Sequence, residues 1–198
     1  MSKAELLEQI RKRILDELHD HLRESAQNLV FGKGNPDARI MFIGEAPGEQ
    51  EDVQGVPFVG RAGQELDKLM RSIGLTLDDA YVANILKYRP PNNRDPTNDE
   101  IKAHTPYLVD QIKAIQPKVV ITLGNFSTKF VLADFDTDRM KSIGGISFLH
   151  GKPVQKSING LQFKVYPLYH PAAILYRPGL RQDLEKDFLG IKGLIEQQ

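Results

Sequence analysis

The hydrophobic residues of this chain follow two different spacings, which alternate along the sequence. Short runs that are almost entirely apolar occur at residues 39–43, 81–86, 119–123 and 163–169. Apolar residues recur every three or four positions at residues 61–73, 98–115, 125–133 and 181–196. The first spacing is typical of buried strands and the second of amphipathic helices. Strands that alternate with helices predict an α/β protein with a parallel sheet that helices cover on both faces.

The chain opens with a further helical pattern. Within residues 4–24, the apolar side chains at helical spacing are Leu7, Ile10, Ile14, Leu18 and Leu22. We therefore expect one amphipathic N-terminal helix there. The glycine-rich segment 135–160 predicts a hairpin or an irregular excursion. No internal repeat or linker-like composition interrupts the chain, so we expect residues 1–198 to form a single domain.

Composition narrows the possible functions. Lysine plus arginine and aspartate plus glutamate both number 26, so the formal net charge is zero. This balance argues against a protein that binds nucleic acid over its whole surface, but it is compatible with local basic loops. The absence of cysteine excludes disulfides and thiolate-held metal clusters. No apolar run suits a membrane span or a signal peptide, so we expect a cytoplasmic, intracellular protein.

The connection at residues 44–64 is longer than a simple turn requires and contains unusually many glycine and acidic residues. It joins a predicted strand to a predicted helix and contains five glycines, four carboxylates and the apolar insert 56–59. Long connections of this kind more often bind ligands or carry catalytic residues than act as spacers. The glycine pattern matches neither a phosphate-binding loop nor a dinucleotide fingerprint. A tight turn without chemistry is the alternative for residues 44–48.

A parallel sheet brings the carboxyl ends of its strands to one edge, where ligands bind. Those ends lead here into segments 44–48, 87–94, 124–125 and 170–171. Asn84 interrupts an apolar strand, so its amide needs hydrogen-bond partners. Phe58 lies in a loop of glycine and proline, and His170 ends a strand. Each residue alone is compatible with a structural role, but their convergence favours a functional site.

Five successive motifs resemble those of the family 4 uracil-DNA glycosylases. They read GEAPGEQED, GVPFVGRAGQ, NILKYRPPNNRDPTNDE, PKVVITLG and HPAAIL, and they extend from about residue 28 to residue 174. The resemblance implies a three-layer α/β/α sandwich with a short, mainly parallel central sheet. It also implies a monofunctional glycosylase in base excision repair. Such an enzyme hydrolyses the N-glycosidic bond of uracil left by cytosine deamination and leaves an abasic site.

The resemblance implies a pocket for a base that has been rotated out of the DNA stack. The residues implied to bind uracil are Gly44, Ala46, Phe58 and Asn84. Phe58 would stack on the ring. The amide of Asn84 presents one donor and one acceptor, which match O4 and N3–H of uracil and oppose the amino group of cytosine.

Cleavage of the glycosidic bond leaves negative charge on uracil O2. His170 and backbone N–H groups of residues 44–48 are implied to stabilise it. A carboxylate must steady the cationic sugar and orient water, and Glu45 is the first candidate. Other uracil glycosylases carry an aspartate one position later, where this chain has Ala46, so Glu51 is the reserve candidate. Solvent-facing loop charges are the alternative interpretation of both carboxylates.

Grip on DNA would come from local contacts. The side chains expected to reach phosphates are Lys87, Arg89 and Arg94. The loop expected to wedge into the opened base stack contains Ala172, Leu175, Tyr176 and Arg177. We expect a monomer whose partner is uracil-containing DNA and whose binding is modest and salt-sensitive.

The sequence departs from the family at the cofactor. Family 4 enzymes typically hold a 4Fe–4S cluster on four cysteines, and the corresponding positions here are Glu17, Asp20, Tyr88 and His104. None is cysteine, so we expect no such cluster and no other cofactor. His104 falls on the apolar stripe of its predicted helix, and we expect it to bond to Asp20 or Glu17. Zinc on His104, Asp20 and Glu17 with His19 or His21 is the less favoured alternative.

Two other functions stay open at this stage. One is a glycosylase of the same fold with shifted specificity, for example for hypoxanthine or xanthine. The other is a catalytically silent relative that binds DNA. The presence of Glu45, Phe58, Asn84 and His170 together argues against decay, because no structural requirement links them. A variant that traps DNA covalently through a histidine is disfavoured, because the loop after the second predicted strand contains none.

Overall fold

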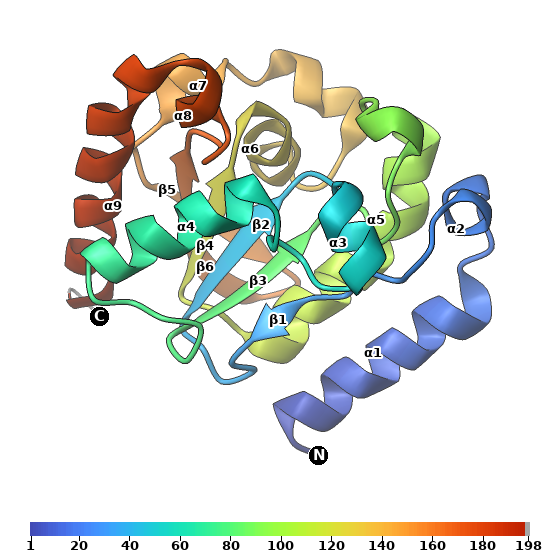
Figure 1. The fold of residues 1–198 in the computed structure, drawn as a ribbon. Helices are drawn as coiled ribbons and strands as arrows, with labels where there is room; N and C mark the ends of the chain where they lie inside the picture. Colours follow the sequence, from blue (N-terminus) through green and yellow to red (C-terminus); the bar gives the residue numbers. More distant parts are fainter. Residues whose placement is uncertain (197–198) are drawn as a thin grey trace.

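A six-stranded sheet forms the centre of the computed structural model, which describes residues 1–196. In chain order the strands are β1 (Lys33–Gly34), β2 (Ile40–Gly44), β3 (Ala80–Asn84), β4 (Val119–Leu123), β5 (Val154–Ile158) and β6 (Leu161–Leu168). They lie in the spatial order β1-β3-β2-β4-β6-β5 (Figure 1). The inner four strands are parallel, and the edge strands β1 and β5 pair antiparallel. The predicted mainly parallel sheet is confirmed.

The helices surround this sheet. The longer ones are α1 (Lys3–Glu17), α4 (Arg61–Ser72), α5 (Asn98–Ile115), α6 (Asn125–Leu132) and α9 (Arg181–Glu196). The shorter ones are α2 (His21–Ser25), α3 (Glu49–Gln54), α7 (Ile146–Leu149), α8 (Ala173–Tyr176) and the 3-10 turns η1 (Pro91–Asn93), η2 (Thr137–Ser142) and η3 (Pro178–Leu180). The four helices predicted after residue 60 are confirmed to within a residue at either end. The hairpin interpretation of segment 135–160 is confirmed for β5, which pairs with β6.

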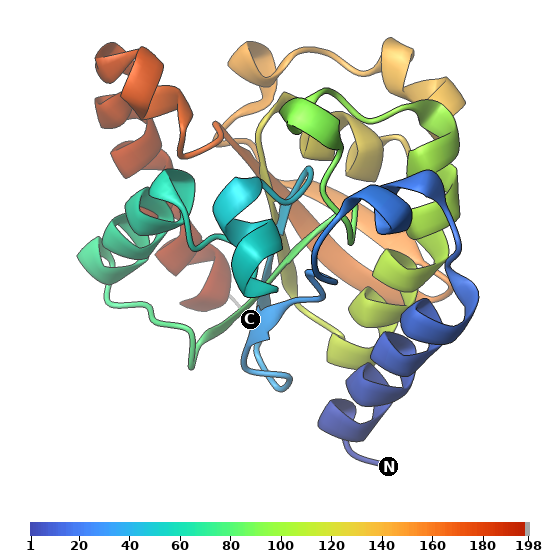
Figure 2. The ribbon, with the colours of Figure 1, turned by 45° about the vertical axis from the view of Figure 1, so that its right-hand side comes forward.

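Two separate apolar layers explain why the strands are apolar throughout. Every residue of β2, β3 and β4 is buried. Met41 and Ile43 pack with residues of α1, α5 and α6, whereas Ile40 and Phe42 pack with α4 and α9. Figure 2 shows the sheet between these two groups of helices. The three-layer α/β/α sandwich is therefore confirmed.

The prediction of one N-terminal helix over residues 4–24 is wrong. Helix α1 ends at Glu17, because Leu18 adopts an extended backbone conformation. Asp20 then begins α2 as its N-cap, and its carboxylate accepts a hydrogen bond from the backbone N–H of Arg23. A short polar side chain that bonds to the backbone in this way favours a helix start over a helix interior. The apolar spacing did not register the break, since Leu18 and Leu22 are buried on either side of it.

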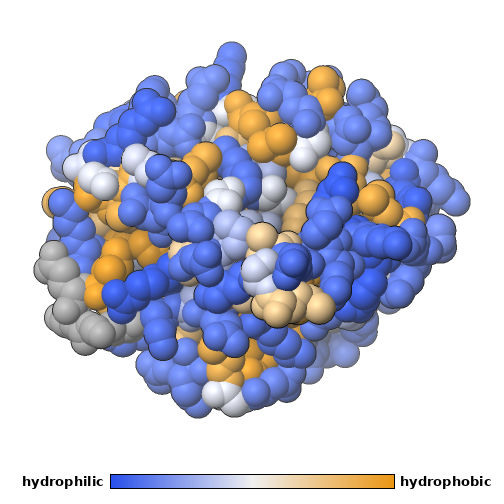
Figure 3. Space-filling model, turned by 90° about the horizontal axis from the view of Figure 1, so that it is seen from below, coloured by the Kyte–Doolittle hydropathy of each residue, from blue (hydrophilic) through white to orange (hydrophobic). Residues whose placement is uncertain are grey.

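The face of the molecule that is seen from below in Figure 1's orientation is mainly polar. The face in Figure 3 carries mostly hydrophilic side chains, with apolar atoms in separate small areas. Among the residues that the structure describes, no helix is both long enough and apolar enough to cross a lipid bilayer.

Candidate active site

The carboxyl ends of the parallel strands bring the predicted site residues to one edge of the sheet. Gly44 at the end of β2 pairs with Asn84 at the end of β3. On the other side of β2, the N–H of Gly124, just after β4, donates to the carbonyl oxygen of Leu168 at the end of β6 (2.9 Å). His170 follows two residues later. Four loops that are far apart in the sequence therefore meet at this edge, as the strand pattern predicts.

The absence of a side chain at Gly44 leaves room for the side chains of Asn84 and Phe58. A Cβ atom at this position would lie 2.4 Å from Asn84 Oδ1 and 2.7 Å from Phe58 Cζ, so any side chain larger than hydrogen would displace one of them. Asn84 is 2% exposed, and its Oδ1 has no hydrogen-bond partner among the described residues. Buried acceptors without a partner are rare in folded proteins. This one is poised to accept a hydrogen bond from a ligand.

Phe58 is held in an uncommon backbone conformation beside His170. Its φ angle is 53°, in the left-handed region, and its ring centroid lies 5.8 Å from that of His170. The Lys33 ammonium donates to the carbonyl oxygen of Phe58 (2.9 Å). A Cβ on Gly63 would lie 1.8 Å from that same oxygen, so only glycine fits there. Strain of this kind persists where surrounding contacts impose it, and it is common at ligand sites.

Glu51 on α3 fixes the same loop from the other side. Its Oε1 accepts hydrogen bonds from the backbone N–H groups of Val59 (2.9 Å) and Gly60 (2.7 Å). Gly60 is the N-cap of α4, so this contact also sets where that helix begins. The geometry gives Glu51 a role in positioning the loop that carries Phe58.

His170 is set up as a neutral hydrogen-bond donor. Its Nδ1 accepts from the backbone N–H of Ala172 (3.2 Å), so the proton of the neutral ring lies on Nε2. Burial lowers the pKa of His170 to about 4, and the charge of Glu51 only partly offsets this effect. The backbone of Gly124 approaches closely, since a Cβ there would lie 3.1 Å from His170 Cβ, and its φ angle of 97° suits glycine.

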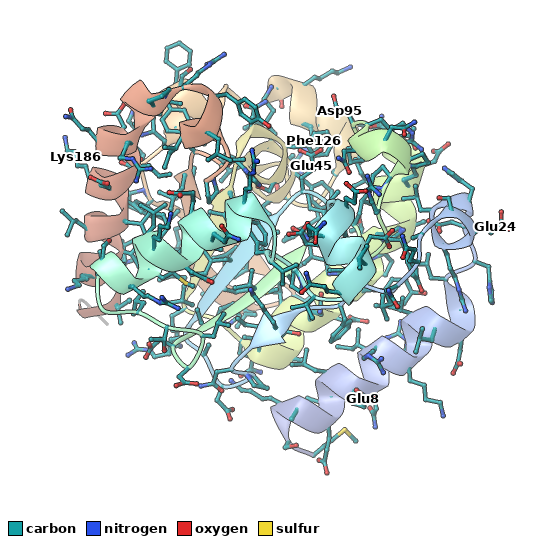
Figure 4. All side chains as sticks on the ribbon, viewed as in Figure 1. Glu8, Glu24, Glu45, Asp95, Phe126 and Lys186 are labelled. Carbon is teal, nitrogen blue, oxygen red and sulfur yellow. The ribbon has the colours of Figure 1, made fainter. Side chains whose placement is uncertain are left out.

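Glu45 follows β2 directly and is partly buried. Burial, with a smaller contribution from the nearby charge of Asp95, raises the pKa of its carboxyl to about 7. Figure 4 labels Glu45, Asp95 and Phe126 at the same end of the sheet. Sequence reasoning missed Asp95 and also Lys33. Asp95 lies within the third motif, whereas no pattern in the sequence points to Lys33.

The prediction that Lys87 contacts DNA phosphates is wrong. The side chain is fully buried, and its ammonium donates to Gln111 Oε1 (2.6 Å) and to the carbonyl oxygen of Asn84 (2.7 Å). Burial lowers the pKa of this amine to about 7. Lys87 therefore supports the backbone of Asn84 and does not reach the surface.

The other residues predicted to contact DNA lie closer to solvent. Arg89 donates from Nε to Asn93 Oδ1 (2.8 Å), and Arg94 pairs with Glu100 at the start of α5. On α8 and just after it, Leu175 and Arg177 are exposed. Ala172 is half-buried at the start of this loop. These positions are compatible with contacts to DNA, which stay a prediction.

The four positions that correspond to cluster ligands do not fit an iron–sulfur cluster. His104 is fully buried and bonds through Nε2 to Asp20 Oδ2 (2.8 Å), as predicted. Its Nδ1 accepts the backbone N–H of Lys87 (2.8 Å), so both ring nitrogens are used. The Tyr88 ring packs edge-on against His104, whereas Glu17 lies exposed near Arg13. Without cysteine, the chain cannot ligate a cluster through thiolates.

The zinc alternative has no support in the geometry. Within residues 1–196, no group of three or more histidine, aspartate or glutamate side chains is arranged to hold a metal ion. His21 bonds instead to Glu100 through Nε2 (2.5 Å). Glu100 also forms the capping box of α5 together with Thr97.

The fold and the site define a three-layer α/β protein with aromatic and polar side chains gathered at its strand ends. Comparison with known proteins gives the family. The model of the uracil DNA glycosylase superfamily matches residues 31–190, and the chain belongs to that superfamily. It is 49% identical over 173 residues to a type-4 uracil-DNA glycosylase of Saccharolobus solfataricus, covering 87% of this chain and 78% of that protein.

Two further relatives cover still more of the chain. A type-4 uracil-DNA glycosylase of Archaeoglobus fulgidus is 45% identical over 184 residues, covering 93% of this chain and 90% of that protein. One of Thermotoga maritima is 36% identical over 200 residues, covering 100% of this chain and 98% of that protein. The similarity therefore extends well beyond the site motifs.

Proposed function

We propose that this protein is a monofunctional uracil-DNA glycosylase that hydrolyses the N-glycosidic bond of uracil in DNA and leaves an abasic site. Membership of the superfamily supports the reaction. The unpartnered Asn84 Oδ1 carries the assignment of the substrate, because a buried acceptor of this kind needs a donor such as N3–H of uracil. The Asn84 side-chain NH₂ would donate to O4 of the same base.

Recognition would take place on a base that has left the duplex. Rotating a base out of the stack costs about a few kcal/mol, and stacking on an aromatic ring returns about 1–3 kcal/mol. Phe58 supplies that ring at the site. Cytosine presents an amino group where uracil presents O4. The side-chain NH₂ of Asn84 would then face another hydrogen-bond donor and lose its acceptor. A site built on such hydrogen bonds rejects the wrong base strongly, because its buried polar groups are left unpaired.

Bond cleavage moves the electron pair of the C1′–N1 bond onto the base, and negative charge develops on O2. The Nε2–H of neutral His170 is suited to stabilise that oxygen, together with backbone N–H groups of residues 44–48. Glu45 would steady the positive charge on the sugar and accept the proton of the attacking water. Its pKa of about 7 suits a general base at neutral pH. Glu51 would act through the loop that it positions.

The same proposal extends to the setting of the reaction. Glu45, Phe58, Asn84 and His170 all come from one chain, so no second copy is needed to complete the site, and we propose a monomer. We also propose that it acts in the cytoplasm in association with DNA, because DNA is the proposed substrate.

The test is incubation of the purified protein with a uracil-containing oligonucleotide, followed by alkaline cleavage of abasic sites. The wild type is expected to yield product. Asn84→Ala and His170→Ala are expected to lose most of the rate, about 10²–10³-fold for His170. His19→Ala, at an exposed histidine between α1 and α2, serves as the matched control.

Two outcomes would overturn the proposal. Absence of product from the wild type on both single- and double-stranded substrate would indicate a silent DNA-binding relative. Faster release of hypoxanthine or xanthine than of uracil would indicate shifted specificity.

A further inference from the structure

One segment of the chain is strongly basic, although the net charge of the whole chain is zero. Residues 139–182 contain seven lysines and arginines and no aspartate or glutamate. Three of these cations are neutralised by carboxylates outside the segment: Arg139 and Lys156 by Asp134, and Arg181 by Glu65. Lys141, Lys152 and Arg177 form no ion pair with the described residues and are exposed. A surface of this kind attracts the phosphates of a nucleic acid.

Helix α7 lies in this segment, at the same end of the sheet as the active site. Strand β5 follows α7 and runs antiparallel to β6, so its start lies at the end where β6 leads to His170. The N–H of Ile146 donates to Asn125 Oδ1 (3.1 Å), next to Gly124. At the other end of α7, the His150 ring lies 4.5 Å from the ring of Tyr169. Helix α7 is thus tied to two of the loops that form the site (Figures 1 and 2).

Phe148 on α7 faces solvent. Its exposed fraction is 74%, which is unusual for a phenylalanine on a short helix. Its backbone is nevertheless well held: its carbonyl oxygen accepts from Lys152 Nζ (2.7 Å), and His150 bonds to Asp187 of α9 (2.7 Å). Helix α8, which carries the exposed Leu175 and Tyr176, lies at the same end of the sheet (Figure 1). An aromatic ring on a backbone that is already held loses less conformational entropy when it binds.

A groove lies at the start of α6 and includes Asn125, the residue that bonds to α7. It has a volume of about 560 Å³, and its lining includes Asn125, Phe126, Lys129, Met140 and Lys141. Asp138, the acidic residue in the lining, is paired with Lys102 (3.6 Å). Aromatic and basic side chains along a groove are the combination that binds single-stranded nucleic acid.

We propose that Phe148 is a stacking platform for a nucleobase of the DNA strand that flanks the flipped uracil, and that Lys129, Lys141 and Lys152 hold the adjoining phosphates. This proposal rests on the proposed function and extends it to DNA beyond the base that is cleaved. Because every base presents a flat face, the contact strengthens binding without selecting a flanking sequence.

The first test compares substrates of different length. In Phe148→Ala, KM for a long single-stranded uracil oligonucleotide is expected to rise about five-fold or more, with kcat unchanged. KM for a trinucleotide with a central uracil is expected to stay the same, because it offers no base beyond the immediate neighbours of the uracil. Leu189→Ala removes a similarly exposed apolar side chain from α9 and should leave both values unchanged. An unchanged KM for the long substrate in Phe148→Ala would overturn the proposal.

The second test reports binding directly. The chain has no tryptophan, so Phe148→Trp and Leu189→Trp each introduce a single fluorescent reporter. Uracil-containing oligonucleotide is expected to quench the tryptophan fluorescence of Phe148→Trp strongly and that of Leu189→Trp weakly. Equal quenching in the two variants would contradict the stacking platform. Quenching does not require turnover. A quenched but inactive enzyme would therefore refute the proposed function alone, and an active but unquenched one would refute the platform alone.

Discussion

The buried ammonium of Lys87 donates a 2.7 Å hydrogen bond to the backbone carbonyl oxygen of Asn84. Lys87 is itself held on three sides. Its N–H donates to His104, its carbonyl oxygen accepts from Val30, and its ammonium also bonds to Gln111. The residue that is proposed to read the base thus rests on a polar network that extends into α5 and the N-terminal segment. Polar networks with satisfied members make a local structure rigid.

Replacement of this lysine tests the network. Lys87→Met leaves the carbonyl oxygen of Asn84 and Gln111 Oε1 without their donor, at a cost of about 1–3 kcal/mol for each buried group. We expect a lower free energy of unfolding in urea and a lower kcat/KM for uracil excision. Lys102→Met, an exposed lysine on α5, is the matched control. Equal stability of the two variants would show that the network contributes nothing.

Asn84→Ala is expected to separate stability from activity. The substitution removes a buried acceptor that has no partner, so the free energy of unfolding should stay the same or increase. Uracil excision should fall, since a bidentate pair with a base contributes about 1–3 kcal/mol. Urea denaturation and excision assays on the same preparation check both. A marked loss of stability would mean that the Asn84 amide forms hydrogen bonds within the protein, which would contradict its role as a free acceptor.

Excision should depend on pH through Glu45. Its carboxyl has a pKa of about 7 and must be ionised to accept a proton or to stabilise the sugar cation. The single-turnover rate is therefore expected to rise tenfold per pH unit below this value and to level off above it. Glu45→Gln should be slower and should lack this rise. A wild-type profile that is flat across neutral pH would exclude Glu45 as the titrating group.

The same carboxyl should make the folded protein less stable as pH rises. Its pKa is raised in the folded state from the ordinary value of 4.5 to about 7, so the folded state binds more protons between these values. The stability associated with this group is fully present below 4.5 and is lost as pH rises through 7. We expect Glu45→Gln to gain stability relative to the wild type at pH 8 but not at pH 4. An identical difference at both pH values would contradict this linkage.

Asp20 should stabilise the folded protein through two hydrogen bonds, one to the backbone of α2 and one to His104. Asp20→Ala removes the N-cap of α2, worth about 1 kcal/mol, and leaves the buried Nε2–H of His104 unpaired, at about 1–3 kcal/mol. The free energy of unfolding is expected to fall by about 2 kcal/mol or more. Asp20→Asn should recover part of this loss, because its amide oxygen also accepts hydrogen bonds. Asp16→Ala, an exposed aspartate on α1, should have little effect.

Periodicity predicted most of the architecture. The runs that became β2, β3, β4 and β6 are apolar because a parallel sheet between two helix layers buries both of its faces. Asn84 and His170 were identified because a polar residue at the end of such a run is unusual, and parallel strands bring their ends together. The break between α1 and α2 was missed, since the apolar side chains on both sides of it are buried and their spacing barely changes.

Lys87 shows where the sequence was insufficient. In the sequence it stands beside Arg89 in a proline-rich loop, which suggests a solvent-exposed cation. Only the tertiary structure places the carbonyl oxygen of Asn84 and the amide of Gln111 within reach of its ammonium. The sequence by itself therefore determined the layers, the strand ends and the absence of cysteine ligands, because these depend on local pattern and composition. Which cations reach the surface and which lie inside depends on contacts between distant segments, and the tertiary structure alone decided it.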